Sequence, residues 1–575
     1  MASISRQAPQ PRFEESCAAE ERELLAALQR GDASRARTLA NGLTGRHPER
    51  GIPWKVFGAL LWADGRVEDA VAAMRHSARL LPRDAEAHCN LGLTLAKLER
   101  FAEAEASLLR AIEIDPGFSI AHYRLGMTYS LQARLEEAEI SLRRGIELRS
   151  DYAAGADAQN FSNLLFILSH KPGLDADLLF AEHRRYSELF ESPLLASWPR
   201  HANARDPDRR LKIGFVSGDL YEHSVGRFFA PVAAQLQLCA GLELHAYCAN
   251  AQSDAQSARL RSHFRCWTLI DALPDDALAA RIAQDGIDVL IDLSGHTAHN
   301  RLPLFARKPA PLQVSWLGYP GTTGLRAMDY YLADRNWLPP GECDRFFTEK
   351  LAYLPARWAF EPHAESPPVG PLPALSSGRL TFGSFHRLDK INTSTVDLWS
   401  RLLLALPQTR LVLAGMPGDG RETALLDRFA AHGIARDRLL PHVRCAMGAY
   451  LGRHHEVDIA LDTRPYCGAT TTMHSLWMGV PTLTMTGSAA QSRAGAGIAA
   501  NAGLDGFIAA DDAAFVELGR HWAGRLPELA ALRAESRARL AQSPAGRPDL
   551  IAAHIDAALR RMWHRWCAGL PADSF

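Results

Sequence analysis

The 575-residue sequence lacks the features that mark several classes of protein. Its nine cysteines are scattered and include no C-x-x-C pair, so neither a zinc ribbon nor a disulfide framework is favoured, and a reducing compartment is expected. No apolar run approaches the ~18 residues that span a bilayer, and residues 1–15 carry no apolar stretch like that of a secretion signal. Lys and Arg number 64 against 65 Asp and Glu, so no net field attracts nucleic acid or an anionic membrane. These absences predict a cytoplasmic protein with no nucleic-acid or membrane partner.

The length of the chain predicts several structural units. A chain of 575 residues is too long for one hydrophobic core, and about three or four units are expected. Hydrophobic residues make up 47% and charged residues 22%, as in ordinary globular proteins. The boundaries between the units therefore have to come from the sequence pattern.

A repeat of 34 residues occupies the N-terminal part of the chain. Small residues and prolines recur at this spacing: Gly58, Gly92 and Gly126; Ala70, Ala104 and Ala138; Pro48, Pro82 and Pro116. The period and the small residues resemble the tetratricopeptide repeat, in which Gly and Ala let paired helices approach closely and proline ends one helix before the next begins. We expect residues 17–150 to form an α-helical superhelix whose concave face holds a protein or peptide acceptor. The alternative is that the repeats only cap the rest of the chain or join copies of it into a homo-oligomer.

The pattern changes after residue 150. Helical patterns over 151–205 end in a polar stretch and predict a junction followed by a linker. From Leu211 onward, short apolar runs that end in small residues alternate with helical segments, which predicts parallel, doubly wound sheets. A Pro/Ser/Gly-rich stretch at 365–379 indicates a linker between two such series. We predict an α/β fold of two Rossmann-like halves, 206–364 and 380–545, with a C-terminal helix over 546–575. Such halves suit a nucleotide on one side and an acceptor at the junction.

The segment 461–487 is the most informative one. A strand ends at Asp462, a Pro/Gly turn follows, and three threonines open a helix that begins near Thr471. Backbone N–H groups at a helix start, with hydroxyls beside them, suit a diphosphate. The alternative is a threonine that caps the helix without any ligand. We predict that the following residues bind a nucleotide donor: Gly468, Thr470, Thr471, Thr472 and His474.

A second motif, F-G-S-F-H-R-L-D-K-I-N at 382–392, supplies positive charge. His386, Arg387 and Lys390 follow a strand at the same sheet edge as the threonines. A lysine there can offset the charge of a departing nucleoside diphosphate, as a metal ion does in other enzymes. The alternative is that this residue is a solvated surface lysine. We predict that Lys390 is catalytic and that His386 and Arg387 bind the donor.

Three loops of the first half complete the predicted site. His223 follows the first strand, where a neutral imidazole can act as a general base or hold hydroxyl groups. The loop W-L-G-Y-P-G-T-T-G at 316–324 includes Gly318, Pro320 and Thr322, which we predict to bind the donor because small residues allow close backbone approach. For the loop S-G-H-T-A-H-N at 294–300, a purely structural turn is an equal alternative.

No metal site is expected. Metal-dependent transferases often carry two aspartates one residue apart at a strand end. The pairs of this kind, Asp175/Asp177 and Asp206/Asp208, fall in helical or linker sequence. His454 and His455 lie on a helical pattern, where a packing pair is favoured over zinc.

At these motifs the sequence resembles family 41 of the glycosyltransferases, which contains the intracellular protein O-linked N-acetylglucosamine transferases and the SPINDLY proteins. The resemblance covers nearly the whole chain and is carried by R-K-P-A-P-L-Q-V-S-W-L-G-Y-P-G-T-T-G, F-G-S-F-H-R-L-D-K-I and D-T-R-P-Y-C-G-A-T-T-T. It implies a GT-B fold and inverting, metal-independent transfer of a sugar to Ser or Thr of proteins, with no cofactor.

The resemblance also implies roles for single residues. His223 corresponds to the active-site histidine of the family. Lys390, Thr470 and Thr471 correspond to the residues that hold the diphosphate. Gly318 and Pro320 would lie in the loop beside the donor sugar.

Three positions depart from the acetylglucosaminyl pattern. Ala469 stands where those members have His, His474 where they have an acidic residue, and Arg387 where they have Gln. In its loops the chain looks more like the SPINDLY branch, whose plant members transfer fucose from GDP-fucose. We expect UDP-N-acetylglucosamine as the donor, because bacterial-looking relatives are grouped with that activity. Protein O-fucosyl transfer from GDP-fucose is the first alternative.

Two other functions are compatible with the sequence. One is a tetratricopeptide scaffold with an inactive transferase body, and the other is a transferase that modifies a glycan or Asn. Lys390 and the threonines at 470–472 argue for turnover, because a scaffold has no need of them.

Overall fold

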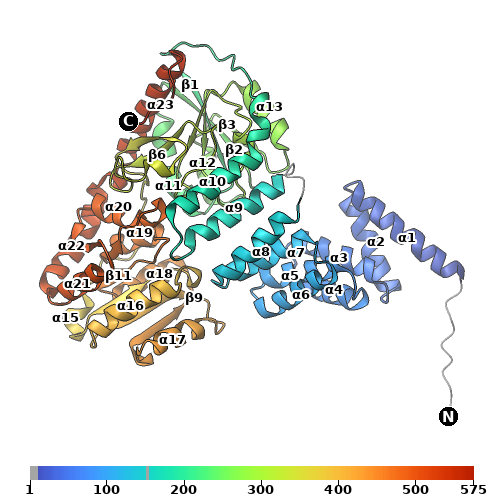
Figure 1. Ribbon diagram of the computed structural model, residues 1–575, viewed down its shortest axis with the longest axis horizontal. Helices are drawn as coiled ribbons and strands as arrows, with labels where there is room; N and C mark the ends of the chain where they lie inside the picture. Colours follow the sequence, from blue (N-terminus) through green and yellow to red (C-terminus); the bar gives the residue numbers. More distant parts are fainter. Residues whose placement is uncertain (1–10, 150–154) are drawn as a thin grey trace. The chain divides into compact units, whose positions relative to one another are not determined.

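The computed structural model describes residues 11–149 and 155–575, and the chain divides into two compact units, Met1–Ser150 and Asp151–Phe575. The predicted boundary between residues 150 and 151 lies outside the described residues. The first unit is helical, and the second contains two parallel sheets with helices around them (Figure 1). The predicted fold class, helical repeats followed by two Rossmann-like sheets, is confirmed.

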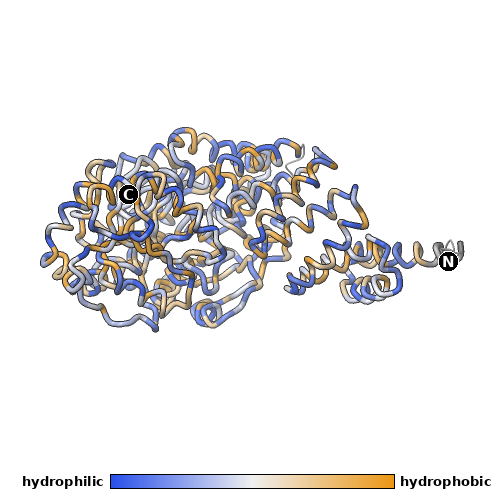
Figure 2. The backbone as a smooth tube through the Cα atoms, turned by 90° about the horizontal axis from the view of Figure 1, so that it is seen from below, coloured by the Kyte–Doolittle hydropathy of each residue, from blue (hydrophilic) through white to orange (hydrophobic). Residues whose placement is uncertain are grey.

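Consecutive helices of the first unit pack in pairs. Their bounds are α1 (Pro11–Gln29), α2 (Ala33–Arg46), α3 (Gly51–Ala63), α4 (Val67–Leu80), α5 (Ala85–Lys97), α6 (Phe101–Ile114), α7 (Ser119–Ser130) and α8 (Leu135–Glu147). A Cβ on Gly92 would lie 2.6 Å from Leu108 Cγ and 3.2 Å from the carbonyl oxygen of Ala104. Gly58 and Gly126 meet the partner helix in the same way. The 34-residue spacing of small residues therefore marks the closest approach of the two helices within each pair. Figure 2 shows that hydrophilic and hydrophobic residues both occur along each of these helices.

The second unit contains two parallel sheets. The first is built from β1 (Leu211–Ser217), β2 (Leu242–Cys248), β3 (Cys266–Leu269), β4 (Val289–Asp292), β5 (Leu312–Ser315), β6 (Tyr330–Asp334) and β7 (Lys350–Leu354), in the order β3-β2-β1-β4-β5-β6-β7. The second is built from β8 (Thr381–Ser384), β9 (Arg410–Met416), β10 (Leu439–Val443), β11 (Ile459–Leu461), β12 (Thr482–Met485) and β13 (Ile508–Ala509), in the order β10-β9-β8-β11-β12-β13. The strands are short, and the central ones are almost fully buried, as expected for sheets that helices cover on both faces. The edge strands β3 and β10 are partly exposed.

Helices connect and cover these strands. They are α9 (Gly155–His170), α10 (Ala176–Phe190), α11 (Ser224–Leu236), α12 (Ala255–Arg261), α13 (Asp275–Asp285), α14 (Leu302–Phe305), α15 (Pro373–Ser377), α16 (Thr393–Ala405), α17 (Glu422–Ala431), α18 (Met447–Gly452), α19 (Thr470–Trp477), α20 (Ala494–Asn501), α21 (Asp512–Ala523), α22 (Leu526–Gln542) and α23 (Pro548–Cys567). Among the residues that the structure describes, no helix is long and apolar enough to cross a membrane.

The strand order fixes where a ligand can bind. In both sheets the direction of winding reverses once, between β1 and β4 and between β8 and β11. Loops at the carboxyl ends of the strands on either side of such a point diverge and leave a crevice. His223 and Lys390 follow β1 and β8, and the three threonines begin the helix that follows β11.

The C-terminal residues tie the two halves together. Helix α22 packs against the second half, where the buried Arg533 donates to the carbonyl oxygens of Gly370 and Val457. Helix α23 returns to the first half and packs on α11, and Trp563 Nε1 donates to the carbonyl oxygen of Asp206 at 2.9 Å. The predicted C-terminal helix is therefore part of the core of the first half.

The substitution Gly92→Ala tests the close approach of the repeat helices. The added methyl group would overlap Leu108, and we expect a loss of about 1–3 kcal/mol in the stability of the repeat unit. Gly45→Ala is the matched control, because Gly45 lies in α2 with nothing within 4 Å of its Cβ position and should be neutral or slightly stabilising. Urea unfolding followed by far-UV circular dichroism measures both variants, and equal effects would contradict the account.

Candidate active site

The start of α19 is the first element of the site. Its N-cap residue is Ala469, and no side chain caps the helix. The three threonine hydroxyls bond elsewhere: Thr470 Oγ1 donates to Ser224 Oγ at 3.2 Å, Thr471 Oγ1 lies 3.2 Å from His386 Nε2, and Thr472 Oγ1 donates to the Gly468 carbonyl oxygen at 3.0 Å. A threonine N-cap, the alternative drawn from the sequence, is therefore not formed. A helix start without a side-chain cap suits an anion.

The buried carboxylate of Asp462 shapes the turn before α19. Its Oδ1 accepts from the backbone N–H groups of Thr463 at 2.9 Å and Gly468 at 2.8 Å, and its Oδ2 accepts from Thr484 Oγ1 at 2.7 Å. His386 Nε2 lies 3.3 Å from Oδ1. Burial alone would raise the pKa of Asp462, but the hydrogen bond and charge of His386, together with the other donors, hold it below the ordinary value. The carboxylate thus stays ionised and fixes both the turn and the histidine.

Gly468 and His386 fit each other closely. A Cβ at position 468 would lie 2.5 Å from His386 Nε2 and 2.3 Å from Thr471 Oγ1, so only glycine fits there. His386 is also held by Ser384, whose Oγ lies 3.2 Å from His386 Nδ1. The structure therefore brings together Gly468, Thr471 and His386, which the sequence analysis assigned to donor binding from two separate motifs.

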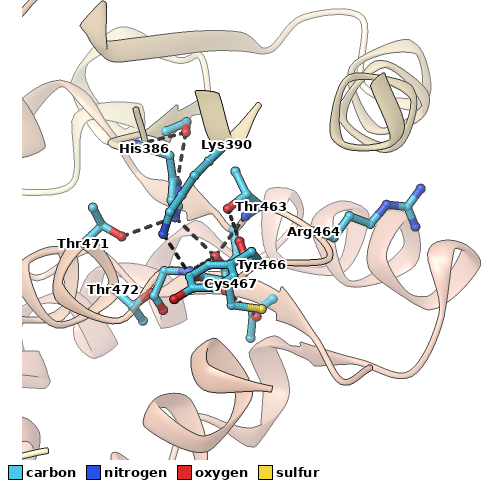
Figure 3. Close-up of polar contacts among 12 residues, drawn as sticks. His386, Lys390, Thr463, Arg464, Tyr466, Cys467, Thr471 and Thr472 are labelled. Atoms are coloured by element: carbon cyan, nitrogen blue, oxygen red, sulfur yellow. Dashed lines mark hydrogen bonds and ion pairs between the residues drawn. The ribbon is translucent and has the colours of Figure 1, made fainter. Parts of the chain in front are cut away.

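Lys390 lies over the same turn. It ends the short 3₁₀ helix η3 (Leu388–Lys390), and its Nζ donates to the carbonyl oxygen of Cys467 at 3.4 Å and lies 4.6 Å from the ring centre of Tyr466. Figure 3 shows the lysine side chain extending toward Tyr466 and Cys467. Burial, with a smaller contribution from the charge of Arg387, lowers the pKa of Lys390 to about 8. Lys390 is therefore a desolvated cation beside the helix start, rather than a solvated surface lysine.

His223 caps α11, the second helix that begins beside the site. It is the N-cap of α11, its Nδ1 accepts from the N–H of Val225 at 3.4 Å, and its side chain is 42% exposed. A neutral imidazole that accepts at Nδ1 carries its proton on Nε2. Asp219 Oδ2 lies 3.6 Å from the same Nδ1 and would accept a proton carried there. The geometry is therefore compatible with both roles expected from the sequence, a general base and a residue that holds hydroxyl groups. The contact between Ser224 and Thr470 places the starts of α11 and α19 against each other.

A cavity of about 220 Å³ lies beside these residues at the carboxyl ends of β8, β9 and β10. Its lining includes Arg387, His442, Cys445, Tyr450 and Arg453. Of this set, sequence reasoning singled out only Arg387, whose side chain is exposed and paired with Asp389. The others were missed because they come from separate segments that only the assembled sheet brings together.

His474 and Gly318 pack closely against neighbouring segments. His474 is buried beside Phe360 and Tyr450, and burial lowers its pKa to about 4, so it is neutral at physiological pH. Gly318 is required by the backbone, because a Cβ there would lie 2.4 Å from the carbonyl oxygen of Leu293. The backbone of Gly318 thus closely approaches the backbone of Leu293, whereas a close approach to a sugar was predicted.

Thr322, one of the predicted donor ligands, has a hydrogen-bond partner within the first half. Its hydroxyl is buried and donates to Glu349 Oε2 at 2.6 Å, so it is committed to the interior of the first half. Pro320 is also buried. Donor binding by Pro320 and Thr322 stays a prediction.

Two histidine motifs prove to be packing features. His296, in the loop 294–300, is fully buried between Ser162 Oγ at 3.0 Å and the Thr323 carbonyl oxygen at 2.9 Å. His454 stacks on Phe385 with ring centres 3.6 Å apart, whereas His455 bonds to the Pro368 carbonyl oxygen. Within residues 11–149 and 155–575, no group of three or more His, Cys, Asp or Glu side chains is arranged to hold a metal ion.

Two Rossmann-like halves that meet at two helix starts, with a half-buried lysine at one of them, define a protein of the GT-B glycosyltransferase class. The chain belongs to glycosyl transferase family 41, whose model matches residues 195–366 and 373–546. Tetratricopeptide repeat models match residues 85–118 and 107–140. The resemblance inferred from the motifs is therefore confirmed.

Relatives with curated names match about two thirds of the chain. The chain is 36% identical over 409 residues to a probable UDP-N-acetylglucosamine–peptide N-acetylglucosaminyltransferase SPINDLY of Arabidopsis thaliana, an alignment that covers 69% of this chain and 44% of the relative. It is 24% identical over 483 residues to the UDP-N-acetylglucosamine–peptide N-acetylglucosaminyltransferase of Caenorhabditis elegans, covering 64% of this chain and 42% of the relative. The chain thus spans less than half the length of these relatives.

A solved structure matches almost the whole chain. A mutant of the Thermobaculum terrenum O-GlcNAc transferase is 30% identical, with a TM-score of 0.81, and the match covers 96% of this chain and 99% of that one. The chain therefore shares its arrangement of helical repeats followed by two Rossmann-like halves with the Thermobaculum protein.

The substitution Asp462→Asn tests the carboxylate that shapes the turn. The pKa of Asp462 is lowered in the folded state, so its contribution to stability is present above about pH 4 and is lost as the pH falls through the lowered value. At neutral pH we expect the variant to lose about 1–3 kcal/mol, seen as a fall of several degrees in the unfolding midpoint. Asp437→Asn, at an exposed position in the same half, is the control and should melt like the wild type. Identical midpoints for the two variants would contradict the role given to Asp462.

Proposed function

We propose that the chain is an inverting glycosyltransferase that moves N-acetylglucosamine from UDP-N-acetylglucosamine to Ser or Thr hydroxyls of proteins, with no metal ion. The observation that carries the proposal is the desolvated Lys390 ammonium beside the uncapped start of α19, at the switch point of the second sheet. The printed names of the Arabidopsis and Caenorhabditis relatives support the donor and the acceptor class.

The residues of the site fit the charge changes of this reaction. The acceptor hydroxyl oxygen attacks the anomeric carbon while the bond from that carbon to the diphosphate oxygen breaks, which inverts the configuration. Negative charge then grows on the leaving diphosphate, where the Lys390 ammonium and the N–H groups of α19 stabilise it. The hydroxyl proton passes to His223 or to a phosphate oxygen of the donor.

The repeats and the cavity extend the proposal to both substrates. We assign the cavity beside Arg387 and Tyr450 to the nucleoside, because it lies at the carboxyl ends of the strands next to His386. A protein or peptide acceptor would be held by the helical repeats, since superhelices of this kind bind extended chains. A cytoplasmic location is supported by the nine free cysteines.

Lys390→Ala tests the proposal. Removal of the ammonium leaves the diphosphate charge without its cation, so we expect sugar transfer from UDP-N-acetylglucosamine to fall by about 100-fold or more. Lys350→Ala, at the exposed amino end of β7, is the matched control and should keep wild-type turnover. Transfer to a peptide mixture is measured by mass spectrometry, with GDP-fucose run in parallel. Wild-type transfer by Lys390→Ala would overturn the assignment, and transfer from GDP-fucose alone would change the donor.

A further inference from the structure

The Lys390 ammonium lies over the aromatic ring of Tyr466, a residue to which the proposed function gives no role. Its Nζ lies 4.6 Å from the ring centre of Tyr466. The ring of His170, at the end of α9, stacks on Tyr466 with centres 3.9 Å apart and planes 9° from parallel. Because a ring stacked at that distance covers one face of Tyr466, the ammonium lies on the other. Phe166 packs against both rings at a tilt, with its ring centre 4.6 Å from that of His170 and 5.9 Å from that of Tyr466.

The ring of Tyr466 is a main contact of the ammonium. Within the described residues Lys390 Nζ makes one hydrogen bond, to the Cys467 carbonyl oxygen, and its length of 3.4 Å marks it as weak. An aromatic face within about 6 Å attracts a cation, most strongly where water is excluded. Figure 3 shows Lys390 and Tyr466 approaching each other from the loops that follow β8 and β11.

His170 can support this contact because it stays neutral. Its Nδ1 lies 2.8 Å from the carbonyl oxygen of Phe166, to which it donates. Burial, and then the charge of Lys390, lowers the pKa of His170 to about 3. A neutral imidazole packs against Tyr466 without repelling the nearby ammonium, so it fixes the plane of the tyrosine ring at no electrostatic cost.

We infer that Tyr466, backed by His170, is a positioning residue that holds the Lys390 ammonium at the start of α19, where the leaving diphosphate lies. This inference rests on the proposed transferase function. It adds to that function the contacts that place the Lys390 ammonium. The ring of Tyr466 comes from the turn between β11 and α19, and His170 comes from α9.

The inference predicts the direction in which the pKa of Lys390 moves when the Tyr466 ring is lost. The groups that face the ammonium are Arg387 and Asp389 on its own turn, Asp462, Tyr466 and Cys467 on the turn before α19, and His170 on α9. An aromatic face favours the charged lysine, so loss of the ring lowers the lysine pKa below about 8. The protonated form is the active one, and activity is lost as the pH rises through the pKa. Loss of the ring therefore moves the alkaline limb of the pH profile to lower pH.

Tyr466→Leu is the test, because leucine keeps apolar bulk and removes the ring. We expect kcat/KM for the donor to fall by about 3- to 30-fold at neutral pH and its alkaline limb to move down by about half to one pH unit. Tyr466→Phe keeps the ring and should return the limb to the wild-type position. Competitive acetylation of lysines, read by mass spectrometry across pH, titrates Lys390 directly and needs no nucleotide.

The outcomes separate this inference from the proposed function. If the Lys390 titration of Tyr466→Leu coincides with that of the wild type, the inference is overturned, whatever the activity. If the wild type transfers no sugar but the Lys390 titration moves as expected, the proposed function fails and the placement of the lysine stands. Should Tyr466→Leu not fold, His170→Leu takes its place: a smaller downward shift supports the inference, and no shift overturns it.

Discussion

The proposed site depends on one buried carboxylate. Asp462 accepts hydrogen bonds from the turn that precedes α19 and from Thr484 on β12, and it pairs with His386 from the loop after β8. The turn before α19, strand β12 and the loop after β8 are thereby fixed to a single ionised group. Such a group is stable in the interior only when its partners are complete. The positions of Gly468, Thr471 and His386 therefore follow from the requirement to satisfy Asp462.

The same turn places the charges of the site. Lys390 bonds to the Cys467 carbonyl oxygen and lies over the ring of Tyr466, and both residues belong to the turn that Asp462 shapes. The start of α19 follows directly, with Ala469 leaving it without a side-chain cap. Ala469 is one of the departures from the acetylglucosaminyl pattern, and here it leaves the helix start open toward Lys390. His474, another departure, contributes a neutral ring instead of a negative charge.

Much of this arrangement could be predicted from the sequence, and the rest could not, for physical reasons. The glycine and alanine spacing predicted the repeat, because close helix contacts need small residues at fixed steps. The strand-turn-helix patterns predicted that Lys390 and the threonines share a sheet edge, because parallel strands end on the same side. Tyr466 and His170 escaped notice because their contact joins a helix and a turn almost three hundred residues apart. The hydrogen bond between Thr322 and Glu349 could not be predicted because Glu349 lies on another segment that the local pattern does not reveal.

The most direct test of the central claim is nucleotide binding to the purified wild-type chain, measured by thermal shift with UDP, GDP and their sugars, with magnesium and with a chelator. A ligand that binds the folded state raises the unfolding midpoint according to its concentration and affinity. The account predicts a shift with UDP and UDP-N-acetylglucosamine that is the same with and without magnesium. A shift that requires magnesium, or none with any of these nucleotides, would contradict it.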